Sequence, residues 1–193
     1  MKRICVYCGS SPGKGTKYQD AASATAEAMV ARGHGLVYGG AHVGLMGLIA
    51  DRVLAGGGEV YGVIPRSMVD REIAHTGLTE LHVVETMHQR KAKMVDLADG
   101  FLALPGAYGT LDEWFETLTW AQLGIHNKPC GLLNLDGYYD GLLMFLDRCV
   151  AEGFLKQSNR ELFLVGTEPG ELLDRMAGWV PVTETKWFTR DVR

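Results

Sequence analysis

Two pairs of charged residues stand near the start of predicted helices, where they can act on a small anion. Arg90 and Lys91 open one helix, and Asp112 and Glu113 fall in the first turn of another. Cations in a first turn oppose the helix dipole, so a bound anion would explain the first pair. A carboxylate that faces the ring of a phosphorylated sugar can stabilise the oxocarbenium-like state of glycoside cleavage or activate water. These residue types indicate a site that binds a sugar phosphate and attacks its glycosidic bond.

The second charged pair follows a glycine-rich turn, Pro105-Gly106-Ala107-Tyr108-Gly109-Thr110. An apolar, strand-like segment over residues 101–104 precedes it. Helical spacing follows, with apolar residues at i, i+3, i+4 and i+7: Leu111, Trp114, Phe115 and Leu118. We therefore expect a strand to end at Pro105 and a helix to begin near Thr110. Glycines let backbone N–H groups approach a ligand closely, and a helix N-terminus favours an anion, so the turn is predicted to bind phosphate.

Each charged residue also has a purely structural interpretation. Thr110 and Glu113 match a capping box, in which the threonine caps the helix and the glutamate reaches back. Asp112 is typical of a surface acid that matches the helix dipole. Arg90 and Lys91 can extend to water, as cations on helices usually do. The pattern alone leaves both interpretations open.

Two further glycine-rich loops follow predicted strands. Gly9-Ser10-Ser11-Pro12-Gly13-Lys14-Gly15-Thr16 is either an ordinary turn or a phosphate or ribose loop. It is not a Walker A loop, because Gly9 lies five residues before Lys14 rather than six and Gly15 takes the Ser/Thr place. Gly39-Gly40 begins a second loop that lacks the dinucleotide G-x-G-x-x-G spacing. A mononucleotide therefore fits better than a dinucleotide.

Strands and helices alternate along most of the chain, usually with short connections. Strands are predicted over residues 3–8, 35–38, 59–64, 81–84, 101–104 and 129–134, with a short final one over 162–165. Helices are predicted over residues 17–32, 44–54, 87–98, 110–124, 138–151 and 169–177. This order indicates an α/β fold, a three-layer Rossmann-like parallel sheet with helices on both faces. Ligands bind such sheets at the carboxyl ends of strands, where all the flagged loops lie.

The remaining segments complete the expected organisation. Residues 1–180 are predicted to form a single nucleotide-binding domain, and residues 181–193 a loosely ordered C-terminal tail. An irregular loop over residues 66–77 follows a strand, a place where such loops are more often functional than filler. The connection therefore belongs to the candidate site.

Composition and cysteine usage exclude several classes of protein. With 193 residues, 47% hydrophobic residues and a formal charge of −4, the chain lacks the basic balance of a nucleic-acid or anionic-membrane binder. No stretch approaches the roughly 20 apolar residues of a membrane span, and we expect a cytoplasmic protein. Cys5 and Cys8 form a C-x-x-C pair, which raises redox or metal chemistry. On a strand they point to opposite faces, so structural thiols and no metal site are expected.

The motifs resemble those of a known family. Residues 105–113 look like the P-G-G-x-G-T-x-x-E signature of the Lonely guy (LOG) family of cytokinin-activating phosphoribohydrolases, and Met87-His88-Gln89-Arg90-Lys91 resembles its second motif. Further similar segments are Tyr7-Cys8-Gly9-Ser10-Ser11, Tyr38-Gly39-Gly40 with Gly44-Leu45-Met46-Gly47, and Thr119-Trp120-Ala121-Gln122-Leu123-Gly124. The resemblance spans residues 3–180. Family members have often been labelled lysine decarboxylases, but nothing in the sequence supports a pyridoxal phosphate site.

The resemblance implies hydrolysis of a nucleoside 5′-monophosphate, an N6-prenylated AMP or AMP itself, to free base and ribose 5-phosphate. It implies that the protein is a homodimer and binds a small-molecule nucleotide as its substrate. It implies no cofactor and no metal. Arg90 and Glu113 become the catalytic pair. The substrate-binding residues that it implies are Gly9, Ser10, Gly39, Gly40, Glu72, Met87, Lys91, Gly106, Ala107, Tyr108, Gly109, Thr110 and Thr119.

One departure and one rival function accompany this resemblance. Ala107 stands where the family signature has its second glycine. If that position needs a positive φ, alanine costs about 1 kcal/mol or more, and if φ is negative the change is harmless. The rival is a non-catalytic protein that binds a nucleotide or a pterin cofactor, which needs the glycine loops but not Arg90 with Glu113. A dinucleotide-dependent oxidoreductase is the third function that we consider, after the hydrolase and the binding protein.

Overall fold

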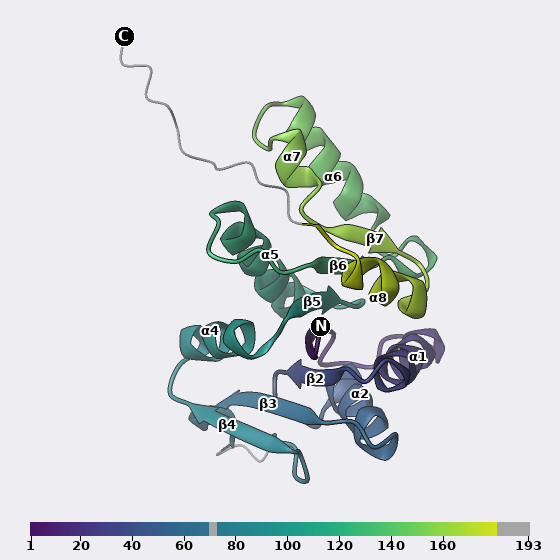
Figure 1. Ribbon diagram of the computed structural model, residues 1–193, viewed down its shortest axis with the longest axis vertical. Coiled ribbons are helices and arrows are strands. Elements are labelled where there is room, and N and C mark those ends of the chain that lie inside the picture. Colours follow the sequence, from purple (N-terminus) through teal and green to yellow (C-terminus); the bar gives the residue numbers. More distant parts are fainter. Residues whose placement is uncertain (70–72, 181–193) are drawn as a thin grey trace.

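A single seven-stranded sheet organises the chain, as a computed structural model describes it for residues 1–69 and 73–180 (Figure 1). The strands are β1 (Arg3–Tyr7), β2 (Gly35–Tyr38), β3 (Val60–Pro65), β4 (Glu80–Val84), β5 (Gly100–Ala103), β6 (Cys130–Leu133) and β7 (Leu164–Gly166). Their spatial order is β4-β3-β2-β1-β5-β6-β7, and every neighbouring pair is parallel. The order reverses between β1 and β5, so the loops after these two strands flank the switch point where ligands bind.

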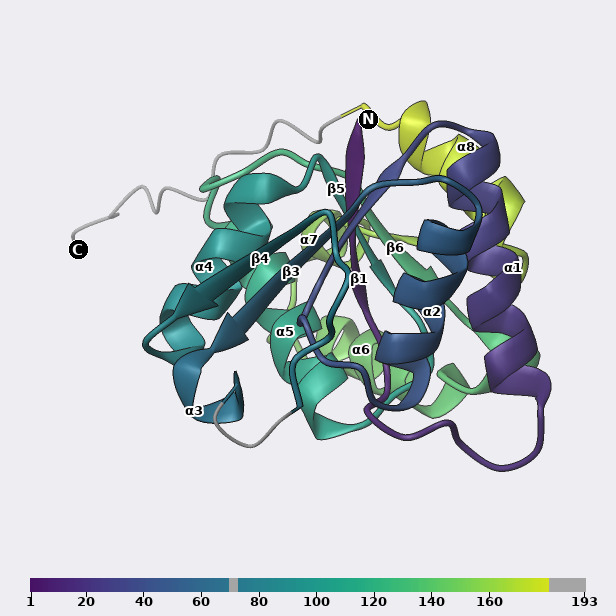
Figure 2. The ribbon, with the colours of Figure 1, turned by 90° about the horizontal axis from the view of Figure 1, so that it is seen from below.

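Helices cover both faces of this sheet (Figures 1 and 2). One face carries α1 (Lys17–Ala31), α2 (Gly44–Ala55) and α8 (Pro169–Ala177). The other carries α4 (Met87–Leu97), α5 (Tyr108–Gln122) and α6 (Asp140–Ala151). Shorter helical pieces are α3 (Arg66–Val69), η1 (Leu135–Gly137) and α7 (Gln157–Arg160). The predicted three-layer Rossmann-like architecture is confirmed.

Alternation along the central strands explains the two cores. In β1, Ile4 and Val6 face the α1 side, whereas Cys5 and Tyr7 face the α5 side. All four are buried, as a parallel sheet covered on both faces requires. Cys8 continues the alternation, so it packs on the opposite side of the sheet from Cys5, and burial raises the pKa of both thiols. In the described ranges no group of three potential metal-ligating side chains comes together.

The start of α5 differs from the prediction. The helix begins at Tyr108, two residues before the expected Thr110, and Ala107 occupies its N-cap position without a side-chain hydrogen bond. Thr110 already lies inside the helix, where its side chain is buried against the turn. The structural alternative for these two residues, a capping box of Thr110 with Glu113, is therefore excluded. Glu113 is one turn deeper in the helix than a capping residue and has its carboxylate available for other contacts.

Three other boundaries also differ. The loop over residues 66–77 contains α3, and Ala74 forms an isolated antiparallel bridge with Ala41. The helix expected from Tyr138 begins at Asp140, because η1 turns through left-handed backbone just before it. The last strand is β7 rather than residues 162–165, and α7 was missed because four residues give no readable period. The predicted tail over residues 181–193 lies outside the described residues.

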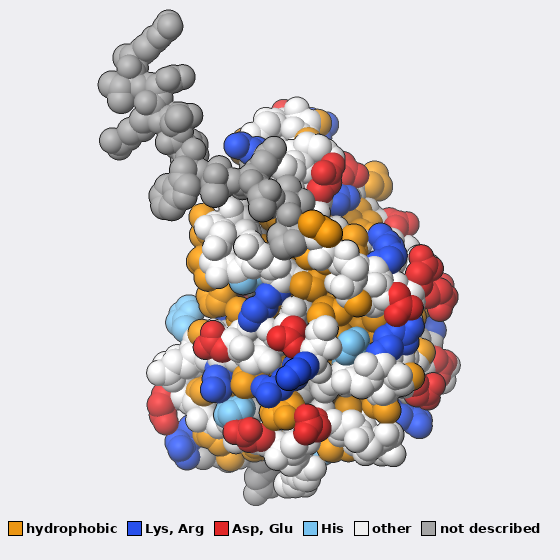
Figure 3. Space-filling view, in the orientation of Figure 1, with side chains coloured by type: hydrophobic (Ala, Val, Ile, Leu, Met, Phe, Trp, Pro, Cys, Tyr) orange, Lys and Arg blue, Asp and Glu red, His pale blue; other side chains and the backbone are white. Residues whose placement is uncertain are grey.

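On the face seen in Figure 3, basic and acidic side chains are interspersed rather than gathered into a field of one sign. Among the helices that the structure describes, none is long and apolar enough to cross a bilayer. The charge pattern on this face thus agrees with the small formal charge of −4.

Candidate active site

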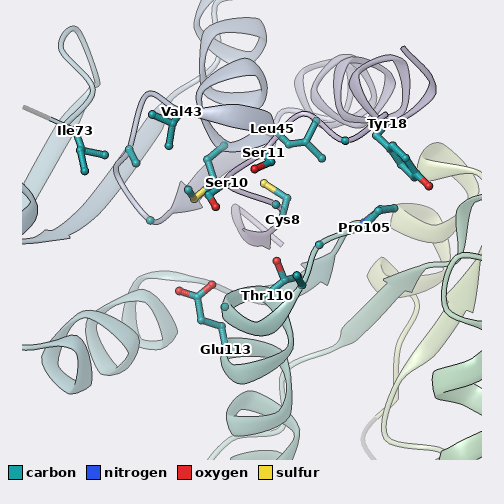
Figure 4. Close-up of a pocket in the computed structure, with 18 of the residues that line it drawn as sticks. Cys8, Ser10, Ser11, Tyr18, Val43, Leu45, Ile73, Pro105, Thr110 and Glu113 are labelled. Carbon is teal, nitrogen blue, oxygen red and sulfur yellow. The ribbon is translucent and has the colours of Figure 1, made fainter. Parts of the chain in front are cut away.

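A cavity of about 520 Å³ opens at the carboxyl edge of the sheet, above β1, β2 and β5 (Figure 4). Its size is typical of a pocket for a nucleotide-sized ligand. The predicted site residues that line it are Gly9, Ser10, Gly39, Met87, Arg90, Gly106, Ala107, Gly109, Thr110 and Glu113. The fold therefore brings together residues from three separate loops and two helices at the switch point.

An array of backbone donors forms one wall of this cavity. The N–H groups of residues 106–110 donate to no acceptor within the described part of the chain, and the next one, at Leu111, bonds the Ala107 carbonyl at 2.9 Å. These groups stand at the positive end of the α5 dipole. Unsatisfied N–H groups at a helix N-terminus make a ready anion site, suited to a phosphate.

The side chains of the turn fit this role. Gly106 has no room for a Cβ, because a methyl there would overlap the Thr110 side chain and approach the Gly9 nitrogen to 3.0 Å. Ala107 has φ −120° and ψ −139°, so the position needs no left-handed backbone. Alanine in place of the family's second glycine is therefore conformationally harmless.

Arg90 and Glu113 meet across the cavity floor. The Arg90 Nη1 and Glu113 Oε1 atoms lie 3.4 Å apart, and the two side chains are only 8% and 12% exposed. Figure 4 shows the Glu113 carboxylate pointing from α5 into the cavity. Burial raises the pKa of this carboxyl, and the positive charge of Arg90 opposes that rise. The arrangement gives a buried carboxyl whose pKa is raised by burial, with Arg90 as the strongest opposing charge.

Backbone carbonyls hold Arg90 in this position. Its Nε donates to the Val63 carbonyl at 3.1 Å and its Nη2 to the Gly39 carbonyl at 3.3 Å. A Cβ on Gly39 would overlap the guanidinium, so the glycine makes room for the arginine. The structural alternative, in which Arg90 extends to water, is thereby excluded. Two strand ends fix the cation beside Glu113.

Comparison with known proteins identifies the family. The family model described as "Possible lysine decarboxylase" matches residues 46–176. The chain is 49% identical over 192 residues to the probable cytokinin riboside 5′-monophosphate phosphoribohydrolase LOGL2 of Oryza sativa subsp. japonica, covering 97% of this chain and 79% of that protein. It is likewise 49% identical over 184 residues to LOG5, a cytokinin riboside 5′-monophosphate phosphoribohydrolase of Arabidopsis thaliana, covering 95% and 81%. The chain belongs to the Lonely guy (LOG) family.

Solved structures share the fold of this LOG-family chain at low identity. The molybdenum cofactor binding protein of Rippkaea orientalis aligns with a TM-score of 0.69 and 18% identity, covering 92% of this chain and 97% of the other. The Moco carrier protein of Chlamydomonas reinhardtii gives a TM-score of 0.68 at 16% identity, covering 92% and 96%. These matches establish the Rossmann-like fold and carry no further information about the ligand.

Lys91 of this LOG-family chain lies outside the cavity wall. Its Nζ is 3.2 Å from Asp112 Oδ2 and 2.9 Å from Glu116 Oε2, so the side chain links α4 to α5. Burial opposes its charged form, but the hydrogen bonds to the two carboxylates outweigh burial and raise its pKa. Lys91 thus offsets the negative charge that neighbours Glu113 on α5.

Four other residues that were predicted to bind the substrate are not among the described residues that line the cavity. Gly40 has φ 73° and gives its carbonyl to the His75 N–H at 2.9 Å. Tyr108 is 93% exposed at the start of α5. Thr119 lies three turns along α5, where its hydroxyl donates to the Phe115 carbonyl. Glu72 lies outside the described residues.

Several residues that line the cavity were not predicted as site residues, because no sequence motif marks them. Tyr18 lies at the same end of the cavity as Pro105 in Figure 4, and Val43 and Ile73 lie at the other end. Tyr138, also a lining residue, packs against Tyr18. The apolar lining consists of Val43, Leu45, Met46, Met68 and Ile73. Isolated tyrosines and methionines are common in cores, so only their position after a strand end, known from the fold, distinguishes them.

Proposed function

We propose that this LOG-family protein hydrolyses the N-glycosidic bond of a nucleoside 5′-monophosphate, releasing the free base and ribose 5-phosphate. The observation that carries the proposal is the buried Arg90–Glu113 pair, 3.4 Å apart, one helical turn from the unsatisfied N–H groups of residues 106–110. A phosphate on those groups places the attached ribose over the carboxylate. The names of the relatives support the same reaction.

The chemistry follows from this placement. As the glycosidic bond breaks, positive charge develops at C1′, and the Glu113 carboxylate stabilises it or takes a proton from the attacking water. Arg90 opposes the rise that burial causes in the pKa of this carboxyl and so favours its ionised form. Backbone carbonyls hold Arg90 in place beside it. Preorganised charge in a partly desolvated cavity acts more strongly than in water. We assign Glu113 as the catalytic carboxylate and Arg90 as its electrostatic partner.

The apolar end of the cavity suits a prenylated base. In Figure 4, Val43 and Ile73 lie at the opposite end from Tyr18 and Pro105. Met46, Met68 and Met87 also line the cavity. Methionines adapt to irregular apolar groups. We infer that adenine and an N6-isoprenoid substituent occupy this end, so N6-prenyl-AMP is a better substrate than AMP.

A direct assay tests both proposals. The purified protein is incubated with AMP or with N6-isopentenyl-AMP, and released base is quantified by chromatography. We expect release from both, with the larger kcat/KM for the prenylated substrate. An Ile73→Ser variant should lower kcat/KM for the prenylated substrate and leave that for AMP unchanged. Absence of base release from either nucleotide would refute the hydrolase function and leave a nucleotide-binding protein.

We further propose that the protein acts as a homodimer, as its family resemblance implies. Three large apolar side chains, Met144, Phe145 and Phe154, are exposed on α6 and the turn after it. Exposed clusters of this kind mark association surfaces in soluble proteins. Light scattering should give twice the chain mass of 21.1 kDa, and Phe145→Glu should reduce it if α6 lies in the interface. A dimer that survives the substitution would move the interface elsewhere.

A further inference from the structure

Donors from the segments after β1 and after β6 hold the carbonyl groups of residues 104–106, where the chain leaves β5. Three consecutive carbonyls each accept a hydrogen bond from a donor outside the turn. The Leu104 carbonyl accepts from the Tyr139 hydroxyl at 2.7 Å, and the Gly106 carbonyl from the Tyr138 hydroxyl at 2.8 Å. Between them, the Pro105 carbonyl accepts from the Gly9 N–H at 3.2 Å. No acceptor in this stretch is left to face an anion.

Planarity of the peptide unit converts these bonds into control of the donors. In a trans peptide the carbonyl of one residue and the N–H of the next point in opposite directions. No cis peptide bond occurs in the described chain. Fixing the Pro105 carbonyl therefore aims the Gly106 N–H, and fixing the Gly106 carbonyl aims the Ala107 N–H. The Gly9 amide and the Tyr138 hydroxyl thus set the direction of the first two N–H groups of the anion site, those of Gly106 and Ala107. Tyr139 holds the Leu104 carbonyl, whose peptide unit ends at the Pro105 nitrogen and carries no N–H.

The segment after β6 is built to place these two tyrosines. Asp136 and Gly137 adopt left-handed backbone, with φ of 49° and 73°, which turns the chain sharply. The Asn134 side chain then accepts from the Tyr139 N–H at 2.7 Å and donates to Asp140 at 2.7 Å. Asn134 itself is buried. These contacts fix the backbone from which both tyrosine side chains extend.

Aromatic neighbours fix the ring of Tyr138. Its centroid lies 5.6 Å from that of Tyr18 and 4.8 Å from that of Tyr139, and both pairs are edge-to-face. Tyr139 is only 3% exposed and cannot rotate freely. Edge-to-face contacts of this kind favour a single ring orientation. The Tyr138 hydroxyl consequently keeps its direction toward the turn even though it lies at the cavity edge.

We propose that Tyr138, supported by Tyr139, is a positioning residue that orients the backbone donors of the turn for the 5′-phosphate of the substrate. The inference rests on the proposed function, since it takes the anion to be the phosphate of a nucleotide. Tyr138 acts through the Gly106–Ala107 peptide unit and not through the reacting atoms. It therefore determines affinity for the phosphate and leaves the bond-breaking step to Glu113.

The test removes one hydroxyl and keeps the ring. Tyr138→Phe loses the donor to Gly106 while retaining both aromatic contacts. We expect KM for N6-isopentenyl-AMP, and the Kd for ribose 5-phosphate measured by calorimetry, to rise together by roughly 2- to 10-fold, the loss typical of one hydrogen bond. We expect kcat and inhibition by free N6-isopentenyladenine to stay unchanged. The matched control is Tyr61→Phe, which loses a hydroxyl bond to Glu59 of 3.0 Å far from the cavity.

The outcomes separate this inference from the proposed function. Calorimetry with ribose 5-phosphate needs no turnover, so a wild-type protein that binds it but releases no base would refute only the hydrolase proposal. Unchanged ribose 5-phosphate affinity in Tyr138→Phe, with a native melting temperature, would overturn the positioning role. Equal losses toward the sugar phosphate and the free base would do the same, because they indicate general damage. If Tyr138→Phe does not fold, Tyr18→Leu provides the second comparison, because it removes one of the edge-to-face contacts that fix the Tyr138 ring.

Discussion

The N-termini of α4 and α5 lie at the same edge of the sheet and differ in how they satisfy their backbone donors. At α4, the Thr86 hydroxyl accepts from the Gln89 N–H at 3.1 Å, and the Gln89 side chain accepts from the Thr86 N–H at 3.3 Å. This capping box closes the helix end. At α5, Ala107 supplies no side-chain cap, and the N–H groups of residues 106–110 have no acceptor among the residues that the structure describes.

This difference agrees with the sequence-based prediction that the turn before α5 binds phosphate. The sequence left open a structural alternative, in which Thr110 and Glu113 form a capping box at α5 and Arg90 and Lys91 extend to water. In the fold, the two cations of α4 serve carboxylates of α5, with Arg90 on Glu113 and Lys91 on Asp112 and Glu116. A helix end that caps itself is a structural element, whereas one that leaves its donors open can bind a ligand. Charged side chains near the start of a helix therefore do not by themselves indicate an anion site. Backbone N–H groups without a cap at the helix start are the better indicator.

The largest expected effect comes from removing the carboxylate beside the open end. Glu113→Gln keeps the side-chain shape but loses the charge, so turnover of N6-isopentenyl-AMP should fall by about 10²- to 10⁴-fold, the range for a catalytic acid–base group. Calorimetric affinity for AMP should stay near that of the wild type, since the N–H groups of the turn are untouched. Retention of full activity would remove Glu113 from its assigned role.

The second test converts the open end into a closed one. Ala107→Asp places a carboxylate at the N-cap of α5, where it accepts from the helix N–H groups and repels a phosphate. We expect KM to rise on the order of 10- to 100-fold, from charge repulsion at close range. Ala107→Gly is the matched control and should keep the wild-type KM, because the backbone at this position has φ −120°. A wild-type KM in the aspartate variant would place the phosphate elsewhere.

The third test concerns the ion pair between Arg90 on α4 and Glu113 on α5. Burial raises the pKa of Glu113 and Arg90 opposes the rise, so Arg90→Gln should raise that pKa further. Catalysis needs the deprotonated carboxylate, so activity is lost as pH falls through this pKa. The acidic limb of the kcat/KM profile should therefore move to higher pH in the variant. A limb that stays in place or moves to lower pH would show that Arg90 does not control the ionisation of Glu113.

The smallest effect is expected at the closed end. Thr86→Ala removes the cap of α4 and should lower the free energy of unfolding by about 1 kcal/mol, as measured by denaturant titration. KM should be unchanged, because strand carbonyls hold Arg90 independently of the cap. A large rise in KM with little loss of stability would mean that the two helix ends are not functionally distinct.

Sequence patterns predicted most of the fold and part of the site. The alternating apolar strands and the glycine turns gave the parallel three-layer sheet and the carboxyl edge at which the cavity lies. Helix starts were less certain, as Thr110 illustrates, because a capping-box pattern fits any threonine three residues before a glutamate. Short elements such as α3 and α7 gave no period to detect.

The sequence by itself determined which residue types stand at each strand end. These include Gly106, whose missing side chain the turn requires, and Glu113, about two helical turns further on. Only the tertiary structure decided which groups meet. Arg90 reaches the Gly39 carbonyl across 51 positions of sequence, and Tyr138 reaches the Gly106 carbonyl across 32. Local propensity carries no information about such distant pairs. They form because the order of the strands brings the loops after β1, β2, β5 and β6 to one edge of the sheet.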